Sequence, residues 1–133
     1  MLNVSHLAGV PLKSPLDEIL LVQSGLQPEA LDALKDFGIS PIETNWIINS
    51  RTLTRRKQRQ QHLTPYETER WLRAAKILSL ALEVFGNKQK ASSWLHKPRK
   101  LFENQSAMEI LHIEAGAQLV EMTLNQIDAG FIS

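Results

Sequence analysis

The sequence of 133 residues contains no cysteine, which excludes a disulfide framework and a thiolate metal site. Its six glycines are scattered and form neither a phosphate-binding loop nor a dinucleotide fingerprint. The four histidines never pair at the i, i+4 spacing of zinc-binding helices, and no serine lies in a nucleophile elbow. We therefore expect no enzyme, no metal site, no cofactor and no small-molecule substrate.

Long hydrophobic runs are also absent. The longest, from Ile77 to Phe85, is interrupted by Ser79 and Glu83 and falls far short of the ~20 residues that a membrane span needs. The first twelve residues place no basic stretch ahead of an apolar one, so we expect no signal peptide. With 43% hydrophobic and 22% charged residues the composition is that of a globular protein. These features, and the missing cysteine, suit a cytoplasmic protein that does not bind membranes.

Positive charge is missing from the last part of the chain. Residues 101–133 contain five acidic side chains and neither Lys nor Arg, whereas residues 51–100 contain thirteen basic and three acidic side chains. Residues 1–50 contain two basic and six acidic ones. Such blocks can mark separate contacts with polyanions and with basic partners, and the alternative is a solvated helical surface.

Helix-capping signals, by contrast, are frequent. Four times a Ser or Thr is followed three residues later by an acid, namely at Ser14, Ser40, Thr64 and Ser106. These signals predict a helix from Pro15 to Gly25, a short helix after Pro41, a long helix from Pro65 to Gly86 and another helix after Ser106. Further helices are expected over 28–37, 51–60 and 88–95. No segment alternates apolar and polar residues over the length of a strand, so the fold is predicted to be all-α.

The last predicted helix carries an apolar stripe at alternating four- and three-residue steps, which runs from Ile113 to Phe131. Gly116 interrupts the stripe. It is expected to be either a break in the helix or a point of close packing.

The segment 41–61 has the layout of a helix-turn-helix, with two short helices separated by residues 48–50. If Leu53 faces the core, the 100° step of an α-helix directs one set of side chains outward. This set comprises Arg51, Thr54, Arg55, Gln58 and Arg59, which we predict to contact DNA. Arginine can pair with guanine edges and neutralise phosphates, and the alternative is a solvated basic helix.

The segment 94–102 mixes aromatic residues with cations. We interpret it as a loop whose Trp94 and Phe102 anchor the core, with contact to a partner as the alternative.

An ordered series of residues in the second half of the chain resembles the C-terminal domain of the Xre/MbcA/ParS antitoxin family. The series is Ala81-Leu82-Glu83-Val84-Phe85-Gly86, Ala91, Trp94-Leu95, Pro98, Leu101, Glu109-Ile110-Leu111, Glu114, Gly116-Ala117, Val120, Leu124, Ile127 and Gly130. Upstream, Ser50-Arg51-Thr52-Leu53, Arg55-Arg56 and Leu63-Thr64 are similar to the Xre-type helix-turn-helix of that family. The family usually has glycine in the loop after the residue matched by Leu101, where this chain has Phe102-Glu103-Asn104.

The resemblance implies an antitoxin of the RES–Xre class. In that class the toxin is a RES-domain protein that consumes NAD, the antitoxin obstructs its active site, and the complex binds its own promoter. The resemblance and the acidic tail together predict that the toxin is contacted by Trp94, Glu114, Glu121, Asn125, Asp128 and Phe131.

The expected architecture is therefore an N-terminal tail over residues 1–13, a helix-turn-helix unit over 14–62, and a long connecting helix with a toxin-binding helical domain over 63–133. The expected partners are a RES-domain toxin, operator DNA and a second copy of the chain, which would pair through an apolar patch around Trp71, Leu80 and Leu82. The alternative function is a stand-alone dimeric repressor.

Overall fold

The protein is described by a computed structural model that covers residues 4–131. Within this range the chain is helical and contains no strand, so the predicted all-α fold is confirmed. The elements are α1 (Val4–Ala8), α2 (Pro15–Ser24), α3 (Ala30–Lys35), α4 (Ser50–Gln58), α5 (Pro65–Phe85), α6 (Lys88–His96), the 3-10 helix η1 (Lys100–Phe102), α7 (Ala107–Ile110) and α8 (Glu114–Asp128). None of these helices is long and apolar enough to cross a membrane.

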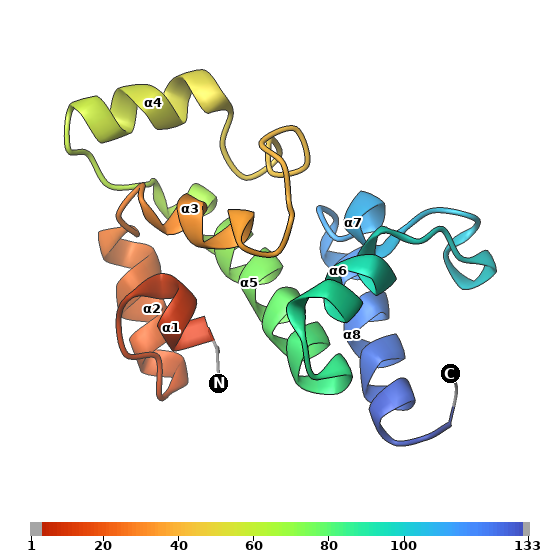
Figure 1. Cartoon of the computed structure of the whole chain (residues 1–133). Coiled ribbons are helices and arrows are strands. Elements are labelled where there is room, and N and C mark those ends of the chain that lie inside the picture. The colour runs from red at the N-terminus through yellow and green to blue at the C-terminus, as the bar shows by residue number, and fades with distance from the viewer. Residues whose placement is uncertain (1–3, 132–133) are drawn as a thin grey trace.

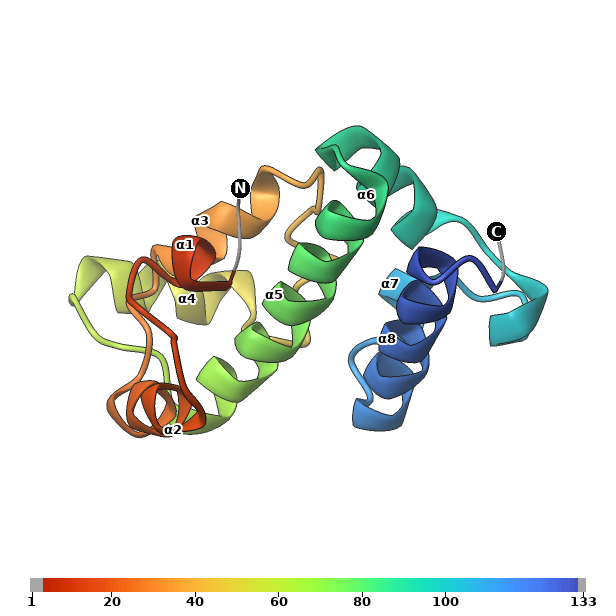
Figure 2. The ribbon, with the colours of Figure 1, turned by 90° about the horizontal axis from the view of Figure 1, so that it is seen from below.

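The long helix α5 is the axis of the molecule (Figure 1). Helices α1, α2 and α3 lie on one side of it, and α6, α7 and α8 lie on the other. Figure 2 shows α8 running alongside α5, and α4 lying far from α8. The elements before and after α5 therefore meet at this one helix.

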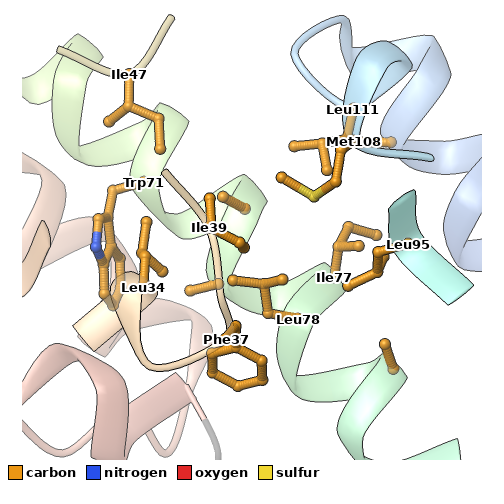
Figure 3. Close-up of a cluster of buried hydrophobic side chains, with 14 of the residues drawn as sticks. Leu34, Phe37, Ile39, Ile47, Trp71, Ile77, Leu78, Leu95, Met108 and Leu111 are labelled. Atoms are coloured by element: carbon orange, nitrogen blue, oxygen red, sulfur yellow. The ribbon is translucent and has the colours of Figure 1, made fainter. Parts of the chain in front are cut away.

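One continuous hydrophobic core joins the two sides of α5 (Figure 3). Trp71, which is fully buried, faces Leu34 on the N-terminal side, while Ile77 lies beside Leu95 on the C-terminal side. The indole Nε1 of Trp71 donates a hydrogen bond to the carbonyl of Ala30 over 3.0 Å, so its polar atom is satisfied inside the core. The first segment also contributes, because Leu7 of α1 is buried within residues expected to be a tail.

Two predicted capping boxes are confirmed, and they fix where α5 and α7 begin. At α5 the backbone N–H of Glu67 donates to Thr64 Oγ1 over 3.2 Å, and the N–H of Thr64 donates to Glu67 Oε1 over 2.8 Å. Ser106 and Glu109 make the same pair of hydrogen bonds at α7. Each box satisfies two N–H groups that a helix start leaves unpaired.

The predicted short helix after Pro41 is wrong. Residues 41–47 form consecutive turns, with hydrogen bonds such as Ile47 N–H to the carbonyl of Thr44 over 2.9 Å. Ser40 and Glu43 do form the expected side-chain to backbone hydrogen bonds, but the β-branched residues and Asn that follow have low helix propensity. Ile42, at the start of these turns, is 87% exposed.

The C-terminal stripe is divided, because the chain leaves α7 at Leu111 and begins α8 only at Glu114. Gly116 lies inside α8, where a β-carbon would be 2.0 Å from the carbonyl oxygen of Ile110. Of the two roles expected for this glycine, close packing is the confirmed one, since the absent side chain lets α8 approach the end of α7.

Replacing Gly116 by Ala should therefore lower the free energy of unfolding by about 2 kcal/mol, as overpacking does. The gain in helix propensity, about 1 kcal/mol, is smaller than the cost of a clash with backbone. The measurement is urea unfolding followed by circular dichroism. Ala115→Ser at the exposed neighbouring position is the control and should change stability by less than about 0.5 kcal/mol. Equal stability of Gly116→Ala and wild type would contradict the close-packing role.

Candidate functional site

Helix α4 is held at its two ends by local hydrogen bonds. Asn49 Oδ1 accepts the N–H of Thr52 over 2.8 Å at the first turn. At the last turn Gln60 adopts a left-handed conformation with φ of 53°, and the N–H of Gln61 donates to the carbonyl of Arg56 over 2.9 Å. This arrangement is typical of a helix that ends abruptly.

The connection after α4 is tied to the connection between α2 and α3. The N–H of Leu63 donates to the carbonyl of Leu26 over 2.8 Å, and a ring nitrogen of His62 lies 2.9 Å from the carbonyl of Gly25. A β-carbon on Gly25 would lie 2.1 Å from the carbonyl oxygen of Leu63, and its φ is +86°. Only glycine allows this approach, so the position of α4 depends on it.

Two cations of α4 point toward the rest of the protein. Arg56 forms a two-pronged salt bridge with Glu67, the capping residue of α5, and both side chains are largely buried. Lys57 forms a salt bridge with Asp32 of α3 over 2.9 Å. The inner face of α4 is therefore fixed by charge as well as by the half-buried Leu53.

Both carboxylates respond to these partners. Burial alone would raise the pKa of the Glu67 carboxyl, but the hydrogen bond from the backbone of Thr64 and the Arg56 guanidinium hold that pKa below its usual value. Burial likewise would raise the pKa of the Asp32 carboxyl, but the hydrogen bond and positive charge of Lys57 outweigh that effect, and the pKa is lowered. Both groups are thus ionised in the neutral range, and each stabilises the attachment of α4.

The outer face of α4 consists of the residues predicted to contact DNA. Arg51, Thr54, Arg55, Gln58 and Arg59 are all exposed. Within residues 4–131 no salt bridge involves any of the three arginines. The helix therefore separates its charges, with two cations paired inward and three cations directed to solvent. Their role in binding DNA stays a prediction.

Helix α8 presents a shallow, open groove of about 420 Å³ on its exposed side. Its lining includes two residues of the predicted toxin contact on α8, Glu121 and Asn125, together with Phe131, which follows the helix and is 80% exposed. Gln118, Met122 and Gln126 complete the lining and were not predicted from the sequence. Met122 could have been found by its position, since residues at i and i+3 or i+4 share a helix face.

Glu114 and Asp128 lie exposed at the two ends of α8, outside this groove. The helix thus brings together Glu121, Asn125 and Phe131 and keeps the other two apart from them.

Trp94 is in a different environment from the other predicted toxin contacts. It is only 7% exposed and packs edge-on against Phe102, with ring centroids 6.2 Å apart, and beside Phe85 at 5.8 Å. The guanidinium of Arg99 lies 4.4 Å from the centre of its ring, and burial lowers the pKa of Arg99. Trp94 therefore belongs to the core of the C-terminal half and not to an exposed contact surface.

The apolar patch predicted for dimerisation is also wrong. Trp71 is fully buried, and Leu80 and Leu82 are half-buried against the core. Three exposed apolar side chains of the N-terminal half lie instead on α2, which buries none of its residues. They are Leu16, Ile19 and Leu20.

The loop after η1 explains the glycine usual in the resembling family. Glu103 and Asn104 have φ of 54° and 65°, a left-handed region that costs a side chain free energy and that glycine adopts readily. This chain adopts that left-handed backbone without glycine.

Within the described residues no group of three His, Cys, Asp or Glu side chains could hold a metal ion.

Comparison with known proteins identifies the second half of the chain. Residues 80–130 match the family model described as Antitoxin Xre/MbcA/ParS C-terminal toxin-binding domain. A protein named Antitoxin Xre from Pseudomonas putida is 40% identical over 93 residues, which cover 70% of this chain and 58% of that relative. Another of the same name from Yersinia enterocolitica is 34% identical over 87 residues, covering 65% of this chain and 59% of the relative. This chain thus spans less than two thirds of either relative.

The salt bridge of Glu67 predicts a pH dependence of stability. Because its pKa is lowered by folding, the carboxylate stabilises the protein above the unfolded pKa of about 4.3, and this contribution is lost as pH falls through the folded value. Glu67→Gln should lower the free energy of unfolding by about 1.5 kcal/mol at pH 7 and flatten its decrease below about pH 5. Urea unfolding at several pH values measures both. Glu69→Gln, at an exposed position two residues along, should leave the profile unchanged, and equal profiles for all three proteins would contradict the role of Glu67.

Proposed function

Because residues 80–130 match the toxin-binding domain of the Xre/MbcA/ParS antitoxins, we propose that the chain is the antitoxin of a type II toxin–antitoxin system. It neutralises a RES-domain toxin that consumes NAD by obstructing the active site of the toxin. It also represses its own operon by binding DNA. It acts by binding alone, without catalysis, and in the cytoplasm.

The observation that carries this proposal is the exposed groove on α8, five of whose six lining residues lie within the segment matched by the toxin-binding domain. The groove combines apolar side chains, Met122 and Phe131, with polar side chains at Glu121 and Asn125. Exposed apolar anchors rimmed by polar groups are typical of protein–protein contacts.

Charge favours the same assignment. A pocket that binds the phosphates of NAD is expected to be positively charged, because phosphate is recognised by cationic side chains and helix N-termini. Helix α8 carries Glu114, Glu121 and Asp128 and neither Lys nor Arg. An acidic helix is a suitable obstruction for a pocket of that kind.

The outer face of α4 supports the second activity. Arg51, Arg55 and Arg59 are exposed on one face and are not engaged by salt bridges within residues 4–131, so they can neutralise phosphates or reach guanine edges. Helix α4 and helix α8 lie on opposite sides of α5 (Figure 1), so DNA and a toxin could be bound at the same time. A homodimer would let two copies of α4 reach half-sites about 10 base pairs apart.

DNA binding is tested with a duplex that contains the promoter of the operon. The Arg51→Ala/Arg55→Ala variant should bind about 10- to 100-fold more weakly, in keeping with a loss of about 1–3 kcal/mol for a base contact. Each lost phosphate contact should also reduce the slope of log K against log salt by about 0.9.

Lys90→Ala/Lys97→Ala is the matched control for this experiment. It removes the same charge from exposed positions outside α4 and should keep most of the affinity. Indistinguishable gel shifts for wild type and the arginine variant would contradict DNA binding by α4.

Toxin neutralisation is tested by growth rescue in cells that express the RES-domain protein of the same operon. Met122→Ala/Phe131→Ala truncates two exposed side chains of the α8 groove and should abolish rescue while the protein remains folded and binds DNA. The matched control, Ile42→Ala/Leu101→Ala, truncates two equally exposed apolar side chains elsewhere and should rescue growth.

Loss of rescue by the control and not by the groove variant would move the inhibitory surface toward residues 94–102. If expression of the neighbouring protein alone is harmless, the antitoxin function fails and the chain acts as a stand-alone repressor.

A further inference from the structure

A second hollow lies between α2, α5 and α8, with a volume of about 820 Å³. It is formed by elements that are far apart in the sequence, since α2 ends at Ser24 and α8 begins at Glu114. Most of its lining comes from α2 and from residues 69–77 of α5, which precede the segment of residues 80–130 matched by the toxin-binding domain.

The cleft has apolar walls. Leu72 and Ile77 of α5 and Ala117 of α8 are buried side chains that line it, and α2 adds Ile19 and Val22. Ile19 is 52% exposed, because no element of residues 4–131 covers this side of α2. The exposed apolar wall is suited to an apolar side chain from another molecule.

The charged side chains that line the cleft are mostly acidic. Its cations are engaged by the protein itself, since Lys76 pairs with Glu18 over 2.9 Å and Arg73 donates to the carbonyl of His112 over 2.7 Å. Its other carboxylates, on Glu69, Glu114 and Glu121, take part in no salt bridge within residues 4–131. Four carboxylates and two cations line the cleft, so its net charge is −2 beside an apolar wall, which favours an occupant that carries both apolar and basic side chains.

The cleft is continuous with the groove on α8. Gln118 and Glu121 line both hollows, so one surface runs from α2 across α8 to Phe131. A protein that binds the groove on α8 can therefore also contact the cleft through one continuous interface.

We propose that this cleft is a second docking site for the toxin, which places a basic amphipathic segment between α2 and α8. The toxin contact then extends from the C-terminal half onto the N-terminal helix α2, and the contact on α2 and α5 adds to affinity. This inference rests on the proposed function, because it assigns the occupant of the cleft to the same toxin.

The acidity of the cleft disfavours the other occupants. DNA is repelled by the three carboxylates. A symmetric contact with a second copy would bring the same patch against itself and so place acid against acid.

The test uses substitutions that lie outside residues 80–130, with one matched control for each. Ile19→Asp adds charge to the apolar wall, and Leu20→Asp is its control, because Leu20 is 53% exposed on the same helix but does not line the cleft. Glu69→Lys reverses a charge of the cleft, and Glu29→Lys makes the same change at an exposed position next to α3, outside the cleft. Melting curves by circular dichroism establish that all four proteins fold.

Affinity for the purified RES-domain toxin is measured by titration calorimetry with the full chain. Ile19→Asp and Glu69→Lys should each bind about tenfold more weakly or worse, while Leu20→Asp and Glu29→Lys bind like wild type. DNA binding should be the same for all four.

If both cleft variants bind the toxin with wild-type affinity while Met122→Ala/Phe131→Ala binds it more weakly, the cleft is not a docking site for the toxin and the proposed antitoxin function stands. Absence of toxin binding by the wild-type chain would overturn both. A change in sedimentation of the free cleft variants without a change in toxin affinity would assign the cleft to a second copy, and the proposal would be wrong.

Discussion

The structure depends most on the carboxylate of Glu67, which takes part both in the capping box of α5 and in the salt bridge to α4. Its Oε1 accepts the N–H of Thr64 and so starts α5, the helix against which both halves of the protein pack. The same carboxylate holds the guanidinium of Arg56 on the inner face of α4. The start of α5 and the orientation of α4 therefore depend on one carboxylate. The next residue, Thr68, accepts the N–H of Leu26 over 3.2 Å and so attaches the chain before α3 to α5.

This link gives α4 a defined outer face. Five cations within nine residues repel one another, and the protein reduces that repulsion by pairing Arg56 and Lys57 with Glu67 and Asp32. Arg51, Arg55 and Arg59 face the solvent, where an anionic partner would reduce the remaining repulsion between their charges. At the other side of α5 the acidic helix α8 offers the opposite charge. The near-neutral protein therefore consists of two surfaces of opposite sign that the core keeps apart.

The sequence was sufficient wherever the determining contact is local. The capping boxes at Thr64 and Ser106 involve residues three apart, and the outward set on α4 follows from the helical step and one inward residue, Leu53. Contacts between distant residues could not be derived in this way, as with Lys57 and Asp32, which are 25 positions apart. The burial of Trp94 and Phe102 was predicted, whereas the packing of Trp94 against Phe85 of α5 was not. The turns over 41–47 show tertiary packing and weak propensity prevailing over a good capping signal.

The central claim is that one chain engages DNA through α4 and a toxin through α8. The most direct measurement is hydrogen–deuterium exchange of the chain alone, with promoter DNA, with the RES-domain toxin and with both. The account predicts that DNA slows exchange in residues 50–60, that the toxin slows it in residues 114–131, and that both effects persist in the ternary complex. Toxin-induced protection of residues 50–60 in place of 114–131, or loss of one protection when the second partner is added, would contradict it.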